Sequence, residues 1–319
     1  MRCLFAHVLV VAVVATAMPA RAAILDDVSG AAAAWSLRQL DDDYAGPAIN
    51  VKRSSDAATM DIGFVGGELD TAALLSFVGS GTGYITTWYD QSGNGRDAIE
   101  GSDAQRPKIV IGGVIQQGFA NNRIGLRYDG NDALTLVEGV LATNTTLMLS
   151  EISVAPASDN SLANRFFNYA NDTSTRFSFG LDGGGEFGVL RTSGTFIDSG
   201  SGIFPPLHQD AYITVTNDFA SPSGSQSYDA DINGTNAFSV SGTTNLSDED
   251  RFVIGAQTSD GTRGLNGFIQ EVIIYDSVLS TSQLAQIHVD QSAYYIPEPG
   301  TFTLAALAAA GLITRRRRA

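Results

Sequence analysis

The stretch DGTRGLNGFIQEVIIYDSVLSTSQLAQI, residues 260–287, carries the clearest structural pattern in this 319-residue chain. Its middle part, Gly267–Tyr275, carries the β-branched and aromatic residues that are typical of a buried strand. Ser280 then offers a helix N-cap, and the amphipathic residues after it predict a helix from Ser280 to about Tyr294. A buried strand followed by a short closing helix favours a β-rich domain.

The chain from Tyr84 onward is predicted to form short strands separated by glycine, asparagine, aspartate and serine. The expected strands are 85–89, 108–111, 124–128, 134–137, 146–154, 165–169, 176–181, 187–191, 212–218, 225–232, 252–256 and 267–275. Glycine accounts for 34 residues, which fits many tight turns. The pattern predicts an all-β fold, an antiparallel β-sandwich or jelly roll with a few short helices.

The region before Tyr84 carries two further predicted helices. Residues 31–40 are rich in good helix formers and follow possible N-caps at residues 26–29, so a helix is expected there. Residues 48–52 are predicted to form a strand, and a second short helix is expected over residues 70–78.

The N-terminal segment has the features of a secretory signal peptide. Arg2 is followed by an apolar run, Leu4–Met18, and then by small residues up to residue 23. The run is too short for a membrane-spanning helix. We therefore expect residues 1–23 to direct export and residues 24–295 to form one domain.

The C-terminal segment, residues 296–319, carries a second sorting signal. Pro297-Glu298-Pro299 is followed by small apolar residues 301–314 and by four arginines. Fourteen helical residues span only about 21 Å, against about 30 Å for a hydrocarbon core. The three-part order resembles the PEP-CTERM sorting tail, which is read by a membrane exosortase and removed, so this segment is expected to anchor the chain transiently.

Composition restricts the ligands that the exported chain can take. Without the arginines of the two end segments, 13 basic residues stand against 34 acidic ones, a net charge near −21. This charge argues against nucleic acid and anionic lipid, and it suits neutral glycans or calcium. The single cysteine, Cys3, lies in the signal segment, so the mature chain is expected to have no disulfide.

An ordered set of motifs runs through the first third of the chain. Tyr-x-Gly-Pro precedes Val-x-Arg-x-Ser-Asp and, later, Tyr-Asp-Gln-Ser-Gly-x-Gly. The positions are Tyr44, Gly46, Pro47, Val51, Arg53, Ser55, Asp56, Tyr89, Asp90, Gln91, Ser92, Gly93 and Gly95. This order is similar to the catalytic domain of glycoside hydrolase family 54, the α-L-arabinofuranosidase B family. Residues 260–287 are similar to the closing strand and helix of laminin-G-like and concanavalin A-like jelly rolls. The resemblance implies a concanavalin A-like sandwich.

The resemblance also implies a retaining glycosidase with two carboxyl groups about 5–5.5 Å apart. Asp260 stands eleven residues before Glu271, which matches the acid/base aspartate of the family. Where the family has its nucleophile in Asp-x-Glu-Asn-Gly, this chain reads FSFGLDGGGEFGV, so Asp182 or Glu186 would have to serve. If Asp182 serves, its shorter side chain moves the attacking oxygen by about 1 Å, and a misplacement of that size can cost on the order of a hundredfold in rate.

The stretch ITTWYDQSGNGRDA, residues 85–98, admits two interpretations. Its polar part can be a structural turn, in which Asp and Asn side chains bond the local backbone. Alternatively, Asp90, Gln91 and Asn94 contact a sugar or calcium directly. Trp88 is correspondingly either a core residue or a platform on which a sugar ring packs.

Other chemistry is not indicated by the sequence. His208 and His288 lack the spacing of zinc ligands or of a catalytic triad. The acidic stretches 247–250 and 229–233 could bind calcium, but neither has the spacing of an EF-hand loop. No cofactor or dedicated metal site is therefore expected, with calcium left open.

These inferences leave two functional hypotheses. The first is an exported α-L-arabinofuranosidase that hydrolyses terminal arabinofuranosyl residues with retention. The second is a non-catalytic glycan-binding or extracellular-matrix protein on the same scaffold. Both predict a polysaccharide or exopolysaccharide ligand, an exosortase-type processing partner, no nucleic acid, and a location at the cell surface or outside the cell.

Overall fold

The computed structural model describes most of the predicted domain and leaves its two end segments aside. The described residues are 23–119, 122–137, 145–154, 165–170, 176–181, 187–190, 196–198, 210–217, 226–242 and 251–296. The predicted signal segment up to residue 22 and the sorting tail from residue 297 therefore lie outside the described residues.

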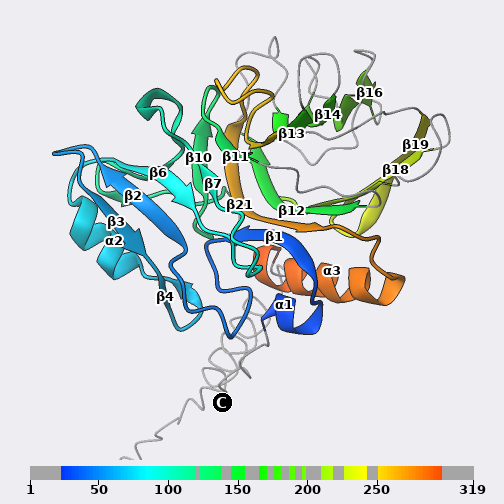
Figure 1. The fold of residues 1–319 in the computed structure, drawn as a ribbon, viewed down its shortest axis with the longest axis horizontal. Helices are drawn as coiled ribbons and strands as arrows, with labels where there is room; N and C mark the ends of the chain where they lie inside the picture. The colour runs from blue at the N-terminus through cyan, green and yellow to red at the C-terminus, as the bar shows by residue number, and fades with distance from the viewer. Residues whose placement is uncertain are drawn as a thin grey trace, which may run out of the picture.

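Strand β21 (Asn266–Tyr275) is the centre of the fold, where the sequence predicts a buried strand. It pairs antiparallel with β1 (Ala31–Ser36), β10 (Leu126–Asp129) and β12 (Thr145–Val154). All its residues after Asn266 are buried. In Figure 1 this strand runs through the middle of a strongly curled sheet, so it joins the two ends of the molecule.

One end of the sheet is built from strands of the first third of the chain. The pairing starts at β3 (Thr59–Ile62) and proceeds through β2 (Ile49–Arg53), β6 (Gly83–Trp88) and β8 (Lys108–Ile111) to β10. Three short elements flank it: β7 (Ala98–Ile99), β9 (Val114–Ile115) and the 3-10 turn Asp103–Gln105. Helix α2 (Thr71–Val78) and the ribbon of β4 (Phe64–Val65) and β5 (Glu68–Leu69) complete this end, as Figure 1 shows.

The other end of the sheet is made by later strands, whose ladders with one another are antiparallel. One branch runs through β11 (Leu134–Val137), β20 (Arg251–Ile254), β13 (Arg165–Ala170), β14 (Arg176–Leu181), β15 (Phe187–Leu190) and β16 (Phe196–Asp198). The second branch leaves β12 through β17 (Ile213–Asn217), β18 (Gln226–Ile232) and β19 (Thr235–Gly242). This is the mostly antiparallel β architecture that the sequence predicts.

Helices α1 (Ile24–Asp27) and α3 (Thr281–Tyr295) cover one face of the β1–β21 pair. Ala34, Ile273 and Ile287 belong to the apolar cluster between helices and strands, and Figure 1 shows both helices beneath the sheet. Ser280 caps α3 in a capping box with Gln283, which confirms the predicted start of this helix. Within the described ranges, no helix has the length and hydropathy needed to cross a membrane.

The main core lies against the opposite face of the β1–β21 pair. The Trp35 ring stacks on Phe252 with centroids 6.0 Å apart, and Phe252 stacks on Phe167 at 5.5 Å. All three side chains are fully buried. This aromatic column connects the first strand of the chain with two strands from its second half.

The prediction of a helix over residues 31–40 is wrong. Residues 31–36 form β1, and every one of them is buried. The helix propensity of alanine is small, so pairing with β21 and burial on both faces outweigh it. The predicted helix over residues 70–78 is confirmed by α2, where the Asp70 carboxylate accepts a hydrogen bond from the Ala73 N–H at 2.9 Å.

Candidate functional site

The polar turn after β6 is held together by the buried carboxylate of Asp90. One oxygen accepts hydrogen bonds from the backbone N–H groups of Ala34 at 2.8 Å and Ser92 at 2.9 Å. The other accepts from the Ser92 hydroxyl at 2.8 Å and from the Arg96 N–H at 3.0 Å. Four donors thus saturate a side chain that is only 4% exposed, and one of them belongs to β1.

The other predicted sugar contacts of this turn also bond within the protein. The Gln91 side chain accepts from the Leu40 N–H at 2.8 Å and donates to the Ser36 carbonyl at 3.1 Å. Asn94 donates to the Ala31 and Ala32 carbonyls, at 3.0 Å each. Trp88, Asp90 and Gln91 are buried, with exposed fractions of 0%, 4% and 1%. Of the four predicted sugar contacts, only Asn94 is exposed. In this structure the turn fastens β1 to the end of β6.

Asp260, the predicted acid/base residue, lies in an exposed turn between β20 and β21. One carboxylate oxygen accepts hydrogen bonds from the Thr258 hydroxyl and, at 3.0 Å, from the Thr262 N–H. These hydrogen bonds hold the pKa of Asp260 below its usual value, and the bond from Thr258 has the largest effect. The carboxylate is therefore ionised and already oriented.

The turn of Asp260 packs closely on the turn that follows β10. A side chain at Gly261, whose φ is +78°, would place its Cβ 1.8 Å from the Asn131 carbonyl oxygen, so only glycine fits. Asp132, which follows Asn131 in this turn, is fully buried. One of its carboxylate oxygens accepts a hydrogen bond from the Asp129 N–H at 3.0 Å, and the other has no hydrogen-bond partner. Burial, followed by the charge of Asp129, raises the pKa of Asp132 to about 7. No sequence pattern predicted this buried acid.

The two nucleophile candidates, Asp182 and Glu186, lie outside the described residues. Strands β14 and β15, which end at Leu181 and begin at Phe187, pair as neighbours on either side of that segment. The assignment of either residue as the nucleophile therefore stays a prediction, as does the separation of either carboxyl group from Asp260.

Glu271, which follows Asp260 by eleven residues, is the centre of a buried polar network. Its side chain is 0% exposed and forms an ion pair with Arg38 at 2.8 Å. It also accepts from the Ser36 hydroxyl at 2.8 Å, the Gln291 amide at 2.6 Å and the Tyr295 hydroxyl at 2.9 Å. Burial alone would raise the pKa of Glu271, but the Arg38 guanidinium keeps it below its usual value. Glu271 is thus a structural anion.

Sequence reasoning missed the partners of Glu271. Arg38 lies just beyond β1 and also forms an ion pair with Asp290 of α3. Three elements far apart in the chain meet at this point, which is why the spacing of residues did not reveal the cluster. The signal that could have found it is the presence of Asp290 and Gln291 in the second half of an amphipathic helix, where both are buried.

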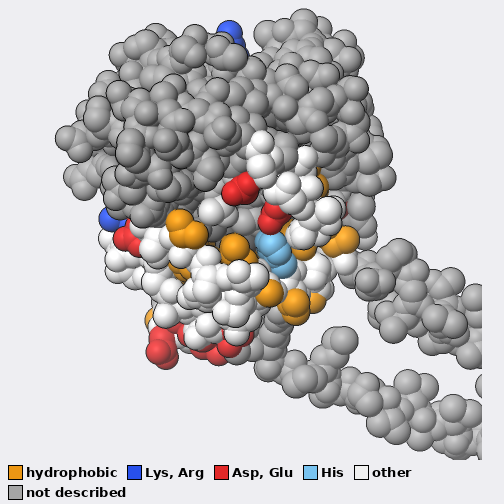
Figure 2. Space-filling view, turned by 90° about the vertical axis from the view of Figure 1, so that its right-hand side faces the viewer, with side chains coloured by type: hydrophobic (Ala, Val, Ile, Leu, Met, Phe, Trp, Pro, Cys, Tyr) orange, Lys and Arg blue, Asp and Glu red, His pale blue; other side chains and the backbone are white. Residues whose placement is uncertain are grey.

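The described histidine, His288, forms no metal site. Its Nε2 lies 3.0 Å from the Thr214 hydroxyl, and its ring packs on Tyr212 with centroids 5.6 Å apart. The face drawn in Figure 2 mixes acidic and apolar side chains, with a histidine side chain exposed among them. Across the described parts of the chain, no three His, Cys, Asp or Glu side chains converge on a point. His208 and the acidic stretch 247–250 lie outside the described residues.

Three family models match the chain. Residues 27–133 match the model described as alpha-L-arabinofuranosidase B, catalytic. Residues 129–285 match the concanavalin A-like lectin/glucanases superfamily, and residues 296–318 match the PEP-CTERM protein-sorting motif. The two domain models meet at the turn after β10, against which the turn of Asp260 packs.

Two curated relatives support the first match. The alpha-L-arabinofuranosidase B of Penicillium canescens is 38% identical over 92 residues, which are 28% of this chain and 19% of that protein. The probable alpha-L-arabinofuranosidase B of Aspergillus fumigatus is 39% identical over 92 residues, 28% of this chain and 17% of that protein. The similarity thus spans about a fifth of the length of these relatives.

Solved structures agree over a longer part of the chain. A glycoside hydrolase family 54 arabinofuranosidase soaked with a cyclic sulfate inhibitor superposes with a TM-score of 0.60 and 17% identity. An arabinofuranosidase complexed with arabinofuranosyl-α-1,2-xylobiose gives 0.61 and 17%. Each alignment covers 85% of this chain and 64% of the other. The chain thus has a concanavalin A-like β-sandwich whose residues 27–133 resemble the alpha-L-arabinofuranosidase B catalytic domain, and it carries a PEP-CTERM sorting motif.

Proposed function

We propose that this protein is an exported glycoside hydrolase that removes terminal α-L-arabinofuranosyl residues from a polysaccharide or exopolysaccharide. The observation that supports it most is that the catalytic-domain model matches residues 27–133 while the fold agrees with arabinofuranosidases over 85% of the chain. Sequence and fold therefore point to the same scaffold.

Asp260 is the proposed acid/base residue. Its carboxylate is exposed, oriented by Thr258 and Thr262, and has a lowered pKa. In that state it suits the half-reaction in which a base activates water. In the other half-reaction the same group must donate a proton to the leaving oxygen, and removal of water by the bound sugar would raise its pKa for that step.

The proposed nucleophile is Glu186 or Asp182, from the segment between β14 and β15. A retaining reaction needs its carboxylate about 5–5.5 Å from that of Asp260, where it forms the glycosyl-enzyme bond as the leaving oxygen takes the proton. Water then breaks that bond and returns the proton to Asp260. The longer side chain of glutamate favours Glu186.

The proposed location follows from the two end segments. Residues 1–23 would direct export, and the PEP-CTERM segment would sort the protein to the cell envelope. An exosortase-type enzyme is the proposed processing partner, acting while the apolar residues before the terminal arginines hold the chain at the membrane.

Hydrolysis of 4-nitrophenyl α-L-arabinofuranoside by the exported protein tests the activity. Substitution Asp260→Asn is expected to lower kcat/KM by a factor between about 10² and 10⁴. Because nitrophenolate leaves easily even without an acid, the substitution should lower kcat/KM more for a substrate with a poorer leaving group. Either Glu186→Gln or Asp182→Asn should abolish turnover, which would identify the nucleophile.

The matched control is Asp41→Asn. The Asp41 carboxylate accepts a hydrogen bond from the Asp43 N–H at 2.8 Å, two residues ahead, as Asp260 does from Thr262. The control makes the same change of charge in the same kind of turn and should leave kcat/KM unchanged. Equal activity of Asp260→Asn and the wild-type protein would contradict the assignment of Asp260.

A second function, glycan binding without hydrolysis, is favoured by one observation. The nucleophile motif of the resembled family is replaced by FSFGLDGGGEFGV. A protein without that nucleophile would keep the scaffold and lose the chemistry. Absence of turnover on every arabinofuranoside, together with retention on an arabinan column, would select this alternative.

A further inference from the structure

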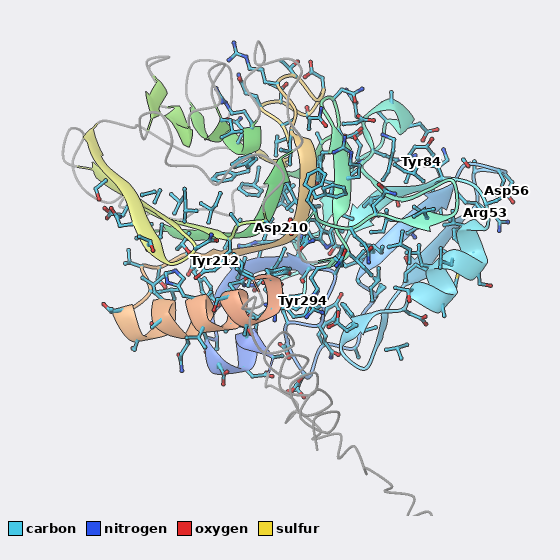
Figure 3. The ribbon with its side chains drawn as sticks, turned by 180° about the vertical axis from the view of Figure 1, so that it is seen from behind. Arg53, Asp56, Tyr84, Asp210, Tyr212 and Tyr294 are labelled. Carbon is cyan, nitrogen blue, oxygen red and sulfur yellow. The ribbon has the colours of Figure 1, made fainter. Side chains whose placement is uncertain are left out.

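A cavity of about 310 Å³ opens beside the last turn of α3. Its walls come from the residues after β1, from β5, from the loop around Asn122 and from the end of α3. The residues that line it are Leu37, Arg38, Glu68, Gln117, Asn122, Arg123, Ile124, Tyr294 and Tyr295. Figure 3 shows Tyr294 at the end of α3 that faces the N-terminal strands. The volume is at the lower end of the roughly 300–1,000 Å³ of small-molecule sites, room for about one sugar ring.

Side chains of the cavity wall are held in place by contacts with one another. The Tyr294 ring lies 4.4 Å from the Arg38 guanidinium and 3.8 Å from that of Arg123, and its hydroxyl donates to Glu68 at 2.5 Å. Arg38 is fixed in turn by its buried ion pairs with Glu271 and Asp290. Side chains that are already ordered lose little entropy on binding, so such a wall favours a ligand.

The charges around the cavity favour a neutral ligand. Arg38 and Arg123 are positive, and Glu68, Glu271 and Asp290 are negative, so the group carries one excess negative charge. Because both carboxylates behind Arg38 are buried, this guanidinium is already neutralised. An anionic sugar or phosphate would therefore meet no excess of positive charge.

The lining has the mixed character that a sugar requires. The Glu68 side chain is 52% exposed and that of Arg123 38%, so a planar carboxylate and a planar guanidinium stand at the rim, 3.5 Å apart. Gln117 and Asn122 add amide groups, while Leu37 and Ile124 supply apolar surface. The hydroxyl groups of a sugar can pair with the charged and amide groups, and the C–H face of its ring can pack on the apolar surface.

We propose that this cavity is a second carbohydrate site, which binds one neutral sugar unit of a glycan away from Asp260. The cavity lies before the start of β10, at Arg123 and Ile124, whereas the turn of Asp260 packs beyond its end, at Asn131. The extended part of the chain between them, β10 and the residues just before it, separates the two by roughly 15–20 Å. A site at that distance holds a polysaccharide without taking part in hydrolysis, so the proposal does not depend on the enzymatic one.

Isothermal titration of the exported protein with L-arabinose, D-xylose and D-glucose tests this site. Saturable binding of at least one of them is expected. Glu68→Gln replaces a charged acceptor at the rim and should weaken that binding about tenfold. Gln117→Ala removes an amide from another wall and should weaken it in the same direction.

Asp61→Asn is the matched control. Asp61 is an exposed carboxylate that accepts a tyrosine hydroxyl, that of Tyr89 at 2.8 Å, as Glu68 does from Tyr294. It does not line the cavity, so its replacement should leave the dissociation constant unchanged. No saturable binding of any of the three sugars, or equal affinity in Glu68→Gln and wild type, would overturn the proposal. Because the readout is equilibrium binding, a failure to hydrolyse arabinofuranosides would leave it standing.

Discussion

At the scale of single residues, the stability of the fold depends on a few buried charges. Glu271 has five hydrogen-bond donors around it, contributed by Arg38, Ser36, Gln291 and Tyr295. An ionised carboxylate is tolerated in the interior only when its oxygens are saturated in this way. The network therefore requires an acid at position 271 and a guanidinium at position 38.

Glu271→Gln is expected to lower the free energy of unfolding by about 3–5 kcal/mol, because it leaves the buried Arg38 with one carboxylate fewer and points an amide N–H₂ at other donors. Urea unfolding followed by circular dichroism measures the change. Asp56→Asn, which breaks the exposed pair with Arg53 at 2.6 Å, should leave the midpoint nearly unchanged. Equal midpoints for wild type and Glu271→Gln would contradict the structural role of this residue.

Asp132 makes stability depend on pH. Its pKa is about 7 in the folded protein and near 3.9 in an unfolded chain. Between those values the folded state binds the proton more tightly, so the free energy of unfolding falls as the pH rises from about 4 to about 7 and is level above. Asp132→Asn should flatten that part of the profile.

Thermal unfolding at pH 5, 6, 7 and 8 measures the effect, with Asp41→Asn as the variant that should keep the wild-type slope. An Asp132→Asn profile as steep as that of the wild type would show that another group carries the pH dependence. Asp129 and Lys108 are the charged groups that set this pH range. The Lys108 ammonium lies 2.6 Å from the Asp129 carboxylate and 3.4 Å from that of Asp132.

At the scale of elements, β1 shows why part of the fold could not be predicted from the sequence. Four consecutive alanines favour a helix locally, yet they form a strand because β21 and the turn after β6 both bind their backbone. Elements with strong local signals, the closing strand and the N-capped helix α3, were predicted correctly. The cluster around Arg38 and the buried Asp132 depend on contacts distant in sequence, so no spacing revealed them.

The role of the turn after β6 can be tested at the same scale. Asp90→Asn turns an amide N–H₂ toward two of the four donors that now bond the carboxylate, and it should lower the free energy of unfolding by about 2 kcal/mol. Hydrogen exchange of residues 31–36 should accelerate, because the turn fastens β1. Asn94→Ala, at an exposed position, is the milder comparison.

A loss of sugar binding by Asp90→Asn at wild-type stability would contradict this structural role and restore the turn as a direct ligand contact. A loss of stability with unaltered exchange in residues 31–36 would place the effect elsewhere than at β1.

At the scale of the whole molecule, β21 joins strands from both ends of the chain. It pairs with β1, β10 and β12. From β12 the sheet continues into the branch that starts at β17, and from β10 it continues through β8, β6 and β7 into the branch that starts at β11. The sequence predicted this strand and the sandwich; the structure confirms the strand, and the comparisons confirm the sandwich. The order in which the branches pair was not predictable, since it depends on register between segments without distinctive motifs.

A chain that ends at residue 259, before β21, is expected to remain unfolded, because the neighbours of that strand then lose their shared partner. Limited proteolysis compares it with a chain that ends at Ile296, which should resist digestion. Equal resistance of the two would show that the N-terminal strands form a stable unit without β21.

The pairing of β1 with β21 also fixes when the protein can finish folding. Ser36 bonds Glu271, 235 positions later in the chain. At about 5–20 residues per second of synthesis, β1 waits roughly 10–50 s for its partner. During that interval β1 is an apolar strand with an unpaired hydrogen-bonding edge, which favours aggregation. A chain that emerges N-terminus first therefore needs a chaperone until its closing strand is synthesised.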